Sequence, residues 1–477
     1  MGSEAILNPL SYNGLLPEFS LLCGIFLICI LIFLNPEKTR GAAFWITLAV
    51  LGMAFFWADG DPAARFPAGI SADSSGFILK RYFCISAAAF LFCWLEWQQE
   101  SGMKMSALFF VLLLVSCLSL MLLVQVNSLW MMLFAAEGFS FSAYALAAHL
   151  GKNGNSAKSV LRYFGTGALA TAVSLFGLTW LIGFEAIPAD GISGFHDSLL
   201  FFPLAGAVLF LAFLLFKTGC FPFHSWLPEV FQEAPVPVAG YLASAPKVAA
   251  AFACLRLVQE LNLNLSVPML LLALMTGLYG NLSAFRATDL KQMLAFSSIG
   301  MAAFLLIPAI FARQVSGSGG QLLYFSLAYG TAVQAAFCAC QYFGSMKSER
   351  LLLSDFAGMF RLNPYGSVGL TALLLAIIGI PPFAGFTGKV LVMSALPAAN
   401  ALEGNNRAML LLLVAVLITV LSAGYFFRVM YQMYFKEARE DLSFQRPFQA
   451  SFLLLWMGVI WQLFAFFFPE FILQASA

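Results

Sequence analysis

Long apolar stretches alternate with short polar connections along almost the whole chain. Crossing the roughly 30 Å hydrocarbon core of a bilayer takes about 20 helical residues, and fourteen stretches approach or exceed that length. They cover residues 15–34, 42–58, 77–97, 103–124, 127–149, 158–184, 200–232, 236–258, 264–286, 291–311, 321–343, 366–398, 409–435 and 449–470. Transmembrane strands would instead need alternating segments of about 10 residues. The pattern predicts an all-α polytopic membrane protein with about 14 transmembrane helices.

Two of these stretches are longer than one span requires, and proline interrupts both. The stretch 200–232 contains the sequence FPFH at 221–224, and the stretch 366–398 contains GIPP at 379–382. Such breaks are tolerated at membrane depth only where the freed backbone groups are buried in protein or line a cavity. We therefore expect two interrupted helices. They lie five helices apart, which predicts that helices 4–8 are repeated, in inverted form, as helices 9–13.

Composition supports the membrane assignment and excludes several functions. Hydrophobic residues make up 61% of the 477 residues and charged residues only 10%, and the net charge of +1 gives no electrostatic footprint for nucleic acid. The longest polar connections, 59–76 and 344–365, are too short to fold alone. The nine cysteines form no CxxC pair and the chain has no nucleotide-binding fingerprint, so any redox cofactors should lie on other chains. The first fourteen residues lack a basic region, so we expect no removable signal peptide.

The connections between the stretches differ in positive charge, and this difference predicts the orientation. Cytoplasmic loops of membrane proteins are enriched in lysine and arginine. Odd-numbered connections carry Lys38, Arg40, Lys104, Lys152, Lys158, Arg162, Arg286, Lys291, Lys347, Arg350, Arg361, Lys436, Arg439 and Arg446, whereas even-numbered ones carry only Arg65, Arg256, Arg313 and Arg407. Lys80 and Arg81, at the start of the third stretch, are ambiguous. The odd connections are thus expected in the cytoplasm and both termini on the opposite side.

Four ionisable residues lie well inside the predicted helices: Glu137, Lys217, Lys247 and Lys389. A charge at the bilayer centre costs about 2.5–3.5 kcal/mol on insertion scales. These side chains are therefore expected to face the protein interior, to pair with one another or to line water. Lys217 precedes the first proline break and Lys389 follows the second, an arrangement that recurs in transporters because half-helix ends add a dipole.

This set of residues is suited to proton transfer. Burial disfavours the cationic form of a lysine and a nearby carboxylate favours it, so buried lysines can alternate between charged and neutral states. Water can carry protons between them. His224, in the first break, is a further candidate because imidazole titrates near neutrality.

Simpler interpretations remain open for each residue. A lone intramembrane lysine can extend its ammonium to the interface. Glu137 can be a structural partner that never titrates, and His224 can serve as a hydrogen-bonding group at a helix end. A membrane scaffold without conduction is also conceivable, although an ordered set of one glutamate and three lysines argues against it.

Three long motifs resemble the antiporter-like subunits of respiratory complex I. They are residues 217–247 (KTGCFPFHSWLPEVFQEAPVPVAGYLASAPK), 289–299 (DLKQMLAFSSI) and 379–389 (GIPPFAGFTGK), and the N-terminal LLPEF at 15–19 is in keeping with them. The resemblance covers about residues 100–435. It is greatest to the N type, known as subunit 2 in mitochondria and chloroplasts, because of the sequence PEVFQEAPVPV and the fourteen helices.

The larger L and M relatives commonly carry a histidine where this chain has Ala243, which also favours the N type. One position departs from the family pattern: the family often has a histidine in the tenth helix where this chain has Met301. This departure puts a histidine relay in the tenth helix in doubt. Pro246, just before Lys247, is also unusual and is expected to kink the eighth helix.

The resemblance implies a proton-translocating subunit of an NADH:quinone oxidoreductase in a bacterial inner membrane. It implies a proton relay of Glu137, Lys217, Lys247 and Lys389, with His224 as a possible addition. NADH, FMN, iron–sulfur clusters and quinone would be bound by other subunits, and M-type, K-, J- and A-type membrane subunits would be neighbours. The expected division is 1–102, 103–258, 259–435 and 436–477. An Mrp-type cation/proton antiporter subunit or the membrane arm of an energy-converting hydrogenase remains an alternative.

Overall fold

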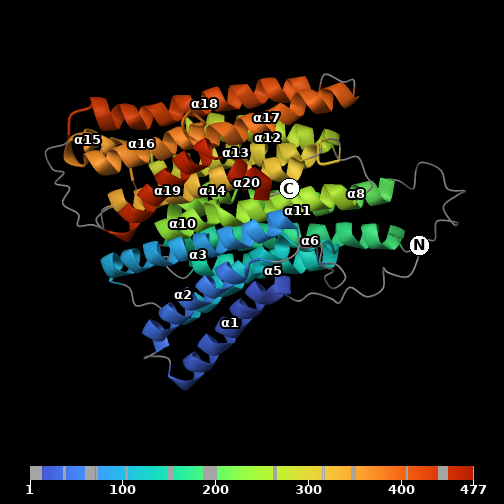
Figure 1. Cartoon of the computed structure of the whole chain (residues 1–477), viewed down its shortest axis with the longest axis horizontal. Coiled ribbons are helices and arrows are strands. Elements are labelled where there is room, and N and C mark those ends of the chain that lie inside the picture. Colours follow the sequence, from blue (N-terminus) through green and yellow to red (C-terminus); the bar gives the residue numbers. More distant parts are fainter. Residues whose placement is uncertain are drawn as a thin grey trace, which may run out of the picture.

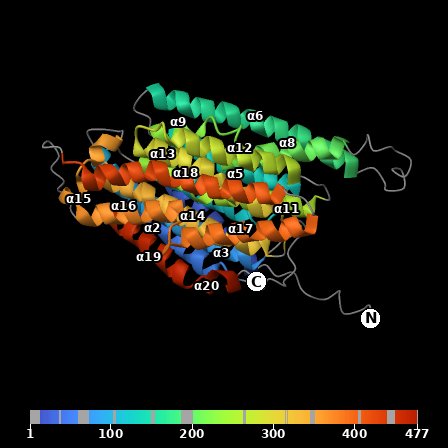
Figure 2. The same cartoon turned by 90° about the horizontal axis from the view of Figure 1, so that it is seen from above.

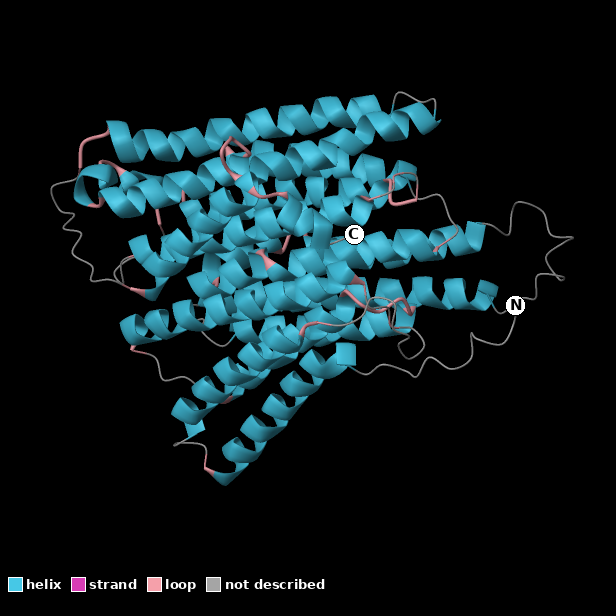
Figure 3. Ribbon diagram, viewed as in Figure 1, coloured by secondary structure: helices cyan, strands magenta, loops and turns pink. Residues whose placement is uncertain are grey.

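A computed structural model of the chain shows how the apolar stretches fold. It describes residues 13–35, 39–59, 70, 73–102, 106–148, 154–185, 201–261, 266–313, 315, 317–344, 351–403, 407–438 and 449–475. Within these ranges the regular elements are all helices (Figure 3).

The described part of the first half of the chain contains ten α-helices. They are α1 (Leu16–Leu34), preceded by the short 3-10 helix η1 (Asn13–Leu15), α2 (Thr39–Trp57), α3 (Ser74–Ser101), α4 (Leu108–Leu123), α5 (Leu129–Ala148), α6 (Gly154–Glu185), α8 (Phe201–Thr218), α9 (Leu227–Glu233), α10 (Val236–Ala243) and α11 (Ala245–Glu260).

The second half continues in the same way. It contains α12 (Ser266–Ala284), α13 (Leu290–Ile310), α14 (Ser318–Phe343), the 3-10 helix η3 (Leu353–Phe356), α15 (Met359–Leu362), α16 (Pro364–Ile378), α17 (Ala384–Glu403), α18 (Arg407–Phe435), α19 (Ala450–Phe467) and α20 (Glu470–Ala475).

Every predicted apolar stretch corresponds to one helix or to two consecutive helices. Within the described ranges, eleven segments are long and apolar enough to cross a membrane, and three shorter apolar helices, Leu108–Leu123, Pro268–Ala284 and Pro364–Ile378, account for the remaining stretches. The prediction of an all-helical protein with about fourteen spans is confirmed.

The long helices run side by side as a bundle, and burial separates central from peripheral ones (Figures 1 and 2). In the spans of α10–α11, α13 and α14, 100%, 94% and 94% of the residues are buried. In the spans of α2, α6 and α19, the buried share is 28% each. The peripheral helices expose large apolar side chains such as Phe56 and Leu161. Such a surface suits lipid, because apolar side chains gain nothing from contact with water.

Both proline breaks interrupt a helix as the sequence predicts. The first separates α8 from α9 and the second separates α16 from α17, and the peptide bonds Phe221–Pro222 and Pro381–Pro382 are cis. A third interruption falls in the stretch 236–258, where Ser244 separates α10 from α11 and donates a hydrogen bond to Gln334 Oε1 (3.2 Å). Pro246 lies in the first turn of α11, where proline is tolerated. The helix is therefore not kinked at Pro246 as expected. It is interrupted two residues earlier, at Ser244.

The packing of α12 against α13 depends on the absence of a side chain at Gly280. A Cβ at this position would lie 2.3 Å from the Gly300 backbone nitrogen and 2.8 Å from its Cα. Because backbone cannot move aside as a side chain can, Gly280→Ala is expected to destabilise the protein by about 1–3 kcal/mol, the usual cost of overpacking. The measurement is the melting temperature of the detergent-solubilised protein by fluorescence-detected size exclusion. Gly52→Ala is the control, since a Cβ there meets nothing within 4 Å, and equal melting temperatures for the two variants would contradict the prediction.

Candidate functional site

The two broken helices end in the same local structure. At the end of α8, Gly219 has a φ of 73°, and Gly219 and Cys220 donate backbone hydrogen bonds to Phe216 O (3.1 Å) and Leu215 O (3.0 Å). At the end of α16, Gly379 (φ 85°) donates to Ala376 O (3.1 Å), and the residue after it donates to Leu375 O (3.1 Å). This is the Schellman arrangement, which favours glycine because the left-handed region penalises a Cβ. Each half-helix thus presents its negative dipole end inside the protein.

Glu137 and Lys217 form a largely buried ion pair. Lys217 is in the last turn of α8 and donates a hydrogen bond to Glu137 Oε1 on α5 at 2.8 Å, with the two side chains 4% and 15% exposed. The ammonium also donates to Ser140 Oγ, one turn further along α5, and lies 4.6 Å from the ring centroid of Phe213. A carboxylate, a hydroxyl and an aromatic face therefore all stabilise the cationic form of this lysine.

Lys247 lies between the end of α8 and the middle of α13. Its ammonium donates to the carbonyl oxygen (3.0 Å) and the hydroxyl oxygen (2.5 Å) of Ser298. A Cβ added to Gly219 would lie 3.7 Å from Lys247 Nζ, so the ammonium also adjoins the C-terminal end of the broken helix α8. The residue is 1% exposed, which excludes extension to the membrane interface.

Lys389 occupies the corresponding place at the second break. It donates a hydrogen bond to the carbonyl oxygen of Ile378, the last residue of α16, at 2.7 Å. Its ammonium lies 5.0 Å from the ring centroid of Phe304 on α13, and the residue is 2% exposed. A cation at the C-terminus of a helix is favoured by the helix dipole. Lys247 and Lys389 therefore each adjoin the end of one interrupted helix.

The four charged residues lie on helices that contact one another in sequence. Lys217 links α5 to α8, α11 packs against α8 and α13, and α13 packs against α17. The structure therefore places Glu137, Lys217, Lys247 and Lys389 inside one continuous body of protein, as the sequence predicts, and Glu137 contacts Lys217 directly. Whether each lysine takes up and releases protons stays a prediction.

His224 is set apart from this series. Its ring centroid lies 4.2 Å from that of Tyr279 on α12 and 5.5 Å from that of Phe221. The side chain is buried, and Nδ1 has no hydrogen-bond partner in the described part of the chain. In the described part of the chain, these contacts join His224 to none of the three lysines, so its role as a relay also stays a prediction.

A second ion pair, between Lys80 and Glu18, is buried and was not predicted from the sequence. Lys80 on α3 lies 2.7 Å from Glu18 Oε1 on α1 and donates to the carbonyl oxygen of Gly14 at 2.6 Å. The side chains of Lys80 and Glu18 are 0% and 5% exposed. The sequence showed Lys80 near the start of an apolar stretch and Glu18 in LLPEF, but nothing in it indicated that the two helices meet there.

The motif at 289–299 has a structural role in this region. Asp289 accepts a hydrogen bond from the backbone of Gln292 (2.7 Å) at the start of α13. Lys291 is buried and donates to the carbonyl oxygens of Gln232 (2.7 Å) and Ala234 (2.9 Å) at the end of α9. This lysine therefore holds the second half of a broken helix in place, and it is a buried structural charge as well as a loop charge.

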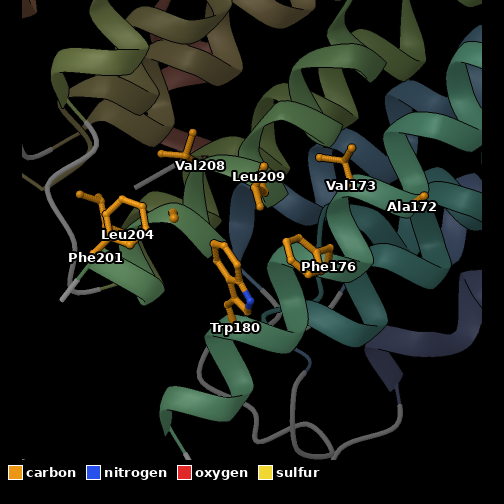
Figure 4. A pocket seen from close by; sticks show the side chains of 9 residues that line it. Ala172, Val173, Phe176, Trp180, Phe201, Leu204, Val208 and Leu209 are labelled. Atoms are coloured by element: carbon orange, nitrogen blue, oxygen red, sulfur yellow. The ribbon is translucent and has the colours of Figure 1, made fainter. Parts of the chain in front are cut away.

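An apolar groove lies elsewhere, between α6 and α8 (Figure 4). It has a volume of about 720 Å³, and side chains such as Phe176, Trp180, Leu204 and Val208 line it. The described residues that line it include no titratable group.

Comparison with known proteins identifies the class to which this arrangement belongs. The model of the family "NADH:quinone oxidoreductase/Mrp antiporter, TM" matches residues 126–422, a region that contains all four charged positions. The chain belongs to this family of antiporter-like membrane proteins.

Individual relatives extend the similarity over almost the whole length. NADH-quinone oxidoreductase subunit N of Halorhodospira halophila is 28% identical over 442 residues, which cover 90% of this chain and 89% of the relative. A chain of respiratory complex I from Thermus thermophilus superposes with a TM-score of 0.78 at 25% identity, covering 97% of this chain and 100% of that one. A chain of the Mrp complex from Dietzia sp. superposes with a TM-score of 0.75 at 16% identity, covering 98% and 96%, and this likeness shows the fold alone.

Proposed function

We propose that this chain is the N-type, proton-translocating membrane subunit of an NADH:quinone oxidoreductase. The observation that carries the proposal is the buried Glu137–Lys217 pair beside a broken helix, followed on consecutive contacting helices by Lys247 and Lys389. A buried ion pair is a costly way to stabilise a fold, since the desolvation of both charges offsets most of their attraction. Buried ionisable groups inside a membrane usually mark an ion or proton pathway.

The mechanism we propose uses the Glu137–Lys217 pair as a switch. While the carboxylate lies 2.8 Å away, Lys217 holds its proton. When the pair separates, or when a charge on a neighbouring subunit competes for Glu137, Lys217 gives its proton to water and Lys247 takes one up. Lys389 then serves as the exit or as the bridge to the next subunit. Since only protons move, the electron-transfer cofactors, NADH, FMN, iron–sulfur clusters and quinone, belong to other chains.

The proposal includes a location and partners. The chain would lie in a bacterial inner membrane with both termini on the non-cytoplasmic side, beside an M-type antiporter-like subunit and small membrane subunits of the K, J and A types. The excess of lysine and arginine in odd-numbered connections supports this orientation.

Affinity purification of the tagged chain from its native membrane tests this function. We expect a complex that oxidises NADH, reduces quinone and acidifies sealed vesicles in proportion to electron flow. Co-purification with cation/proton antiporter subunits and no NADH oxidation would instead assign the chain to an Mrp-type antiporter. Hydrogenase metal sites in the complex would assign it to an energy-converting hydrogenase.

A further inference from the structure

An aromatic cover lies next to Lys217. It consists of Tyr144 (α5), Tyr163 (α6), Phe216 (α8) and Trp226, the residue that precedes α9. Ring centroids are 4.5 Å apart for Tyr144 and Tyr163 and 4.2 Å apart for Tyr163 and Trp226, and the ammonium of Lys217 lies 5.4 Å from the Phe216 ring. The first break thus contributes a side chain to the surroundings of the ion pair.

Two polar atoms of this cover are buried without a well-formed hydrogen bond to the described part of the protein, although the Tyr144 hydroxyl lies near that of Ser140. They are the hydroxyl oxygen of Tyr144 and the indole nitrogen of Trp226, on side chains of residues that are 7% and 3% exposed. Buried polar groups are almost always hydrogen-bonded, and ordered water supplies the partner where protein does not. A phenylalanine would serve for packing alone, so the two polar atoms indicate bound water.

The position of these atoms connects the ion pair to the protein surface. Tyr144 follows Ser140 by four residues and Glu137 by seven, so all three share one face of α5. At the protein surface, Arg162 and Glu229 form an ion pair whose side chains are 48% and 44% exposed. Tyr163 follows Arg162 directly, and Trp226 precedes Glu229 by three residues, so two residues of the cover adjoin this surface pair along the chain.

We propose that Tyr144 and Trp226 hold water that carries protons between the Arg162–Glu229 surface and Lys217. The Tyr144 hydroxyl can both donate and accept a hydrogen bond, and the indole N–H of Trp226 can donate one. A proton passes along the water to the neutral amine of Lys217 or in reverse, and each water that accepts one proton releases another, so that no net bond is lost. Tyr144 is thus a positioning residue for this water. The inference rests on the proposed function and names the side from which Lys217 is reached.

Removing the hydroxyl alone tests the role of Tyr144. Tyr144→Phe keeps the ring and is expected to lower the proton-translocation rate of the assembled complex in vesicles by about fivefold, the factor that corresponds to one hydrogen bond of about 1 kcal/mol. Trp226→Phe is expected to act in the same direction. Electron transfer from NADH to a soluble acceptor does not depend on proton translocation, so its rate should be unchanged in both variants.

A pair of glycines on α6 gives an independent test with a matched control. A Cβ at Gly167 would lie 1.8 Å from the Tyr144 hydroxyl oxygen, so Gly167→Ala must displace this side chain, whereas a Cβ at Gly165 meets nothing within 4 Å. We expect Gly167→Ala to lower proton translocation at normal complex content and Gly165→Ala to leave it unchanged.

The outcomes separate this inference from the function on which it rests. Loss of translocation in Lys217→Met together with normal translocation in Tyr144→Phe and Gly167→Ala overturns the water path and leaves the proposed function standing. Normal translocation in Lys217→Met overturns the proposed function itself. Loss in all three variants, with Gly165→Ala unaffected, supports both.

Discussion

Lys217→Met is expected to lower proton translocation by about a hundredfold or more and to reduce the amount of assembled complex. The first effect follows because the side chain that takes up and releases the proton is gone, and general acid–base groups typically contribute a factor of about 10²–10⁴. The second follows because Glu137 is left without its ammonium partner in a site where its side chain is 15% exposed. Breaking a buried ion pair by removing one partner costs about 3–5 kcal/mol. The measurements are proton uptake per electron in vesicles and complex content by native gel.

A double variant separates the two effects. Lys217→Met combined with Glu137→Gln removes both charges, so the assembled complex should recover, because replacing a whole buried pair by neutral groups is often close to neutral. Proton translocation should not recover. Translocation by the double variant at normal rates would show that the Glu137–Lys217 pair is only structural.

The Glu18–Lys80 pair provides the matched control. It has a similar distance, 2.7 Å, and is at least as deeply buried. Lys80→Met should reduce assembly in the same way as Lys217→Met, and adding Glu18→Gln should restore it. Here translocation per assembled complex should be unchanged throughout, since this pair lies on α1 and α3, outside the series of helices that carries the lysines. Lys217→Arg completes the set: it keeps the charge but cannot release the proton within a protein, so translocation should fall while assembly is retained.

The helices were predictable from the sequence because in lipid every backbone polar group must be satisfied within its own segment. A sufficiently long apolar stretch therefore forms a helix, and a proline at membrane depth usually interrupts that helix. The interruption at Ser244 was not predicted, since the Ser244 hydrogen bond to Gln334 joins residues 90 positions apart. The division into two inverted repeats stays a prediction, although the matching ends of α8 and α16 at Gly219 and Gly379 agree with it.

The charged residues of the candidate site were predictable for a different reason. A charge inside an apolar stretch needs a partner or a cavity, so Lys217, Lys247 and Lys389 could be expected to turn inward. Their neutral partners could not be predicted, because a serine such as Ser298 is common in membrane helices and only its position against Lys247 makes it significant. Sequence patterns along one helix give no information about which residue of another helix it meets.

Lys247 offers the cleaner of the two lysine tests, because its neighbours are uncharged. Its ammonium donates to the carbonyl and hydroxyl oxygens of Ser298, and no salt bridge to it occurs among the described residues. Both hydrogen bonds are compatible with an amine as well as with an ammonium, since N–H donors remain in each form. This suits a group that alternates between the two states. Met301, at the position where relatives often carry histidine, supplies no alternative relay.

Lys247→Met should therefore abolish proton translocation while complex assembly stays close to normal, in contrast to Lys217→Met. No carboxylate is left unpaired by the change, and methionine fills a comparable volume in a site that is 1% exposed. Ser298→Ala, which keeps the carbonyl contact and removes the hydroxyl contact, should lower translocation by about fivefold, as expected for the loss of one hydrogen bond. Proton uptake per electron, measured in vesicles at equal complex content, distinguishes these cases. If the Lys247→Met complex translocates protons at the normal rate, Lys247 is not part of the path, and protons must pass from Lys217 to Lys389 through other groups.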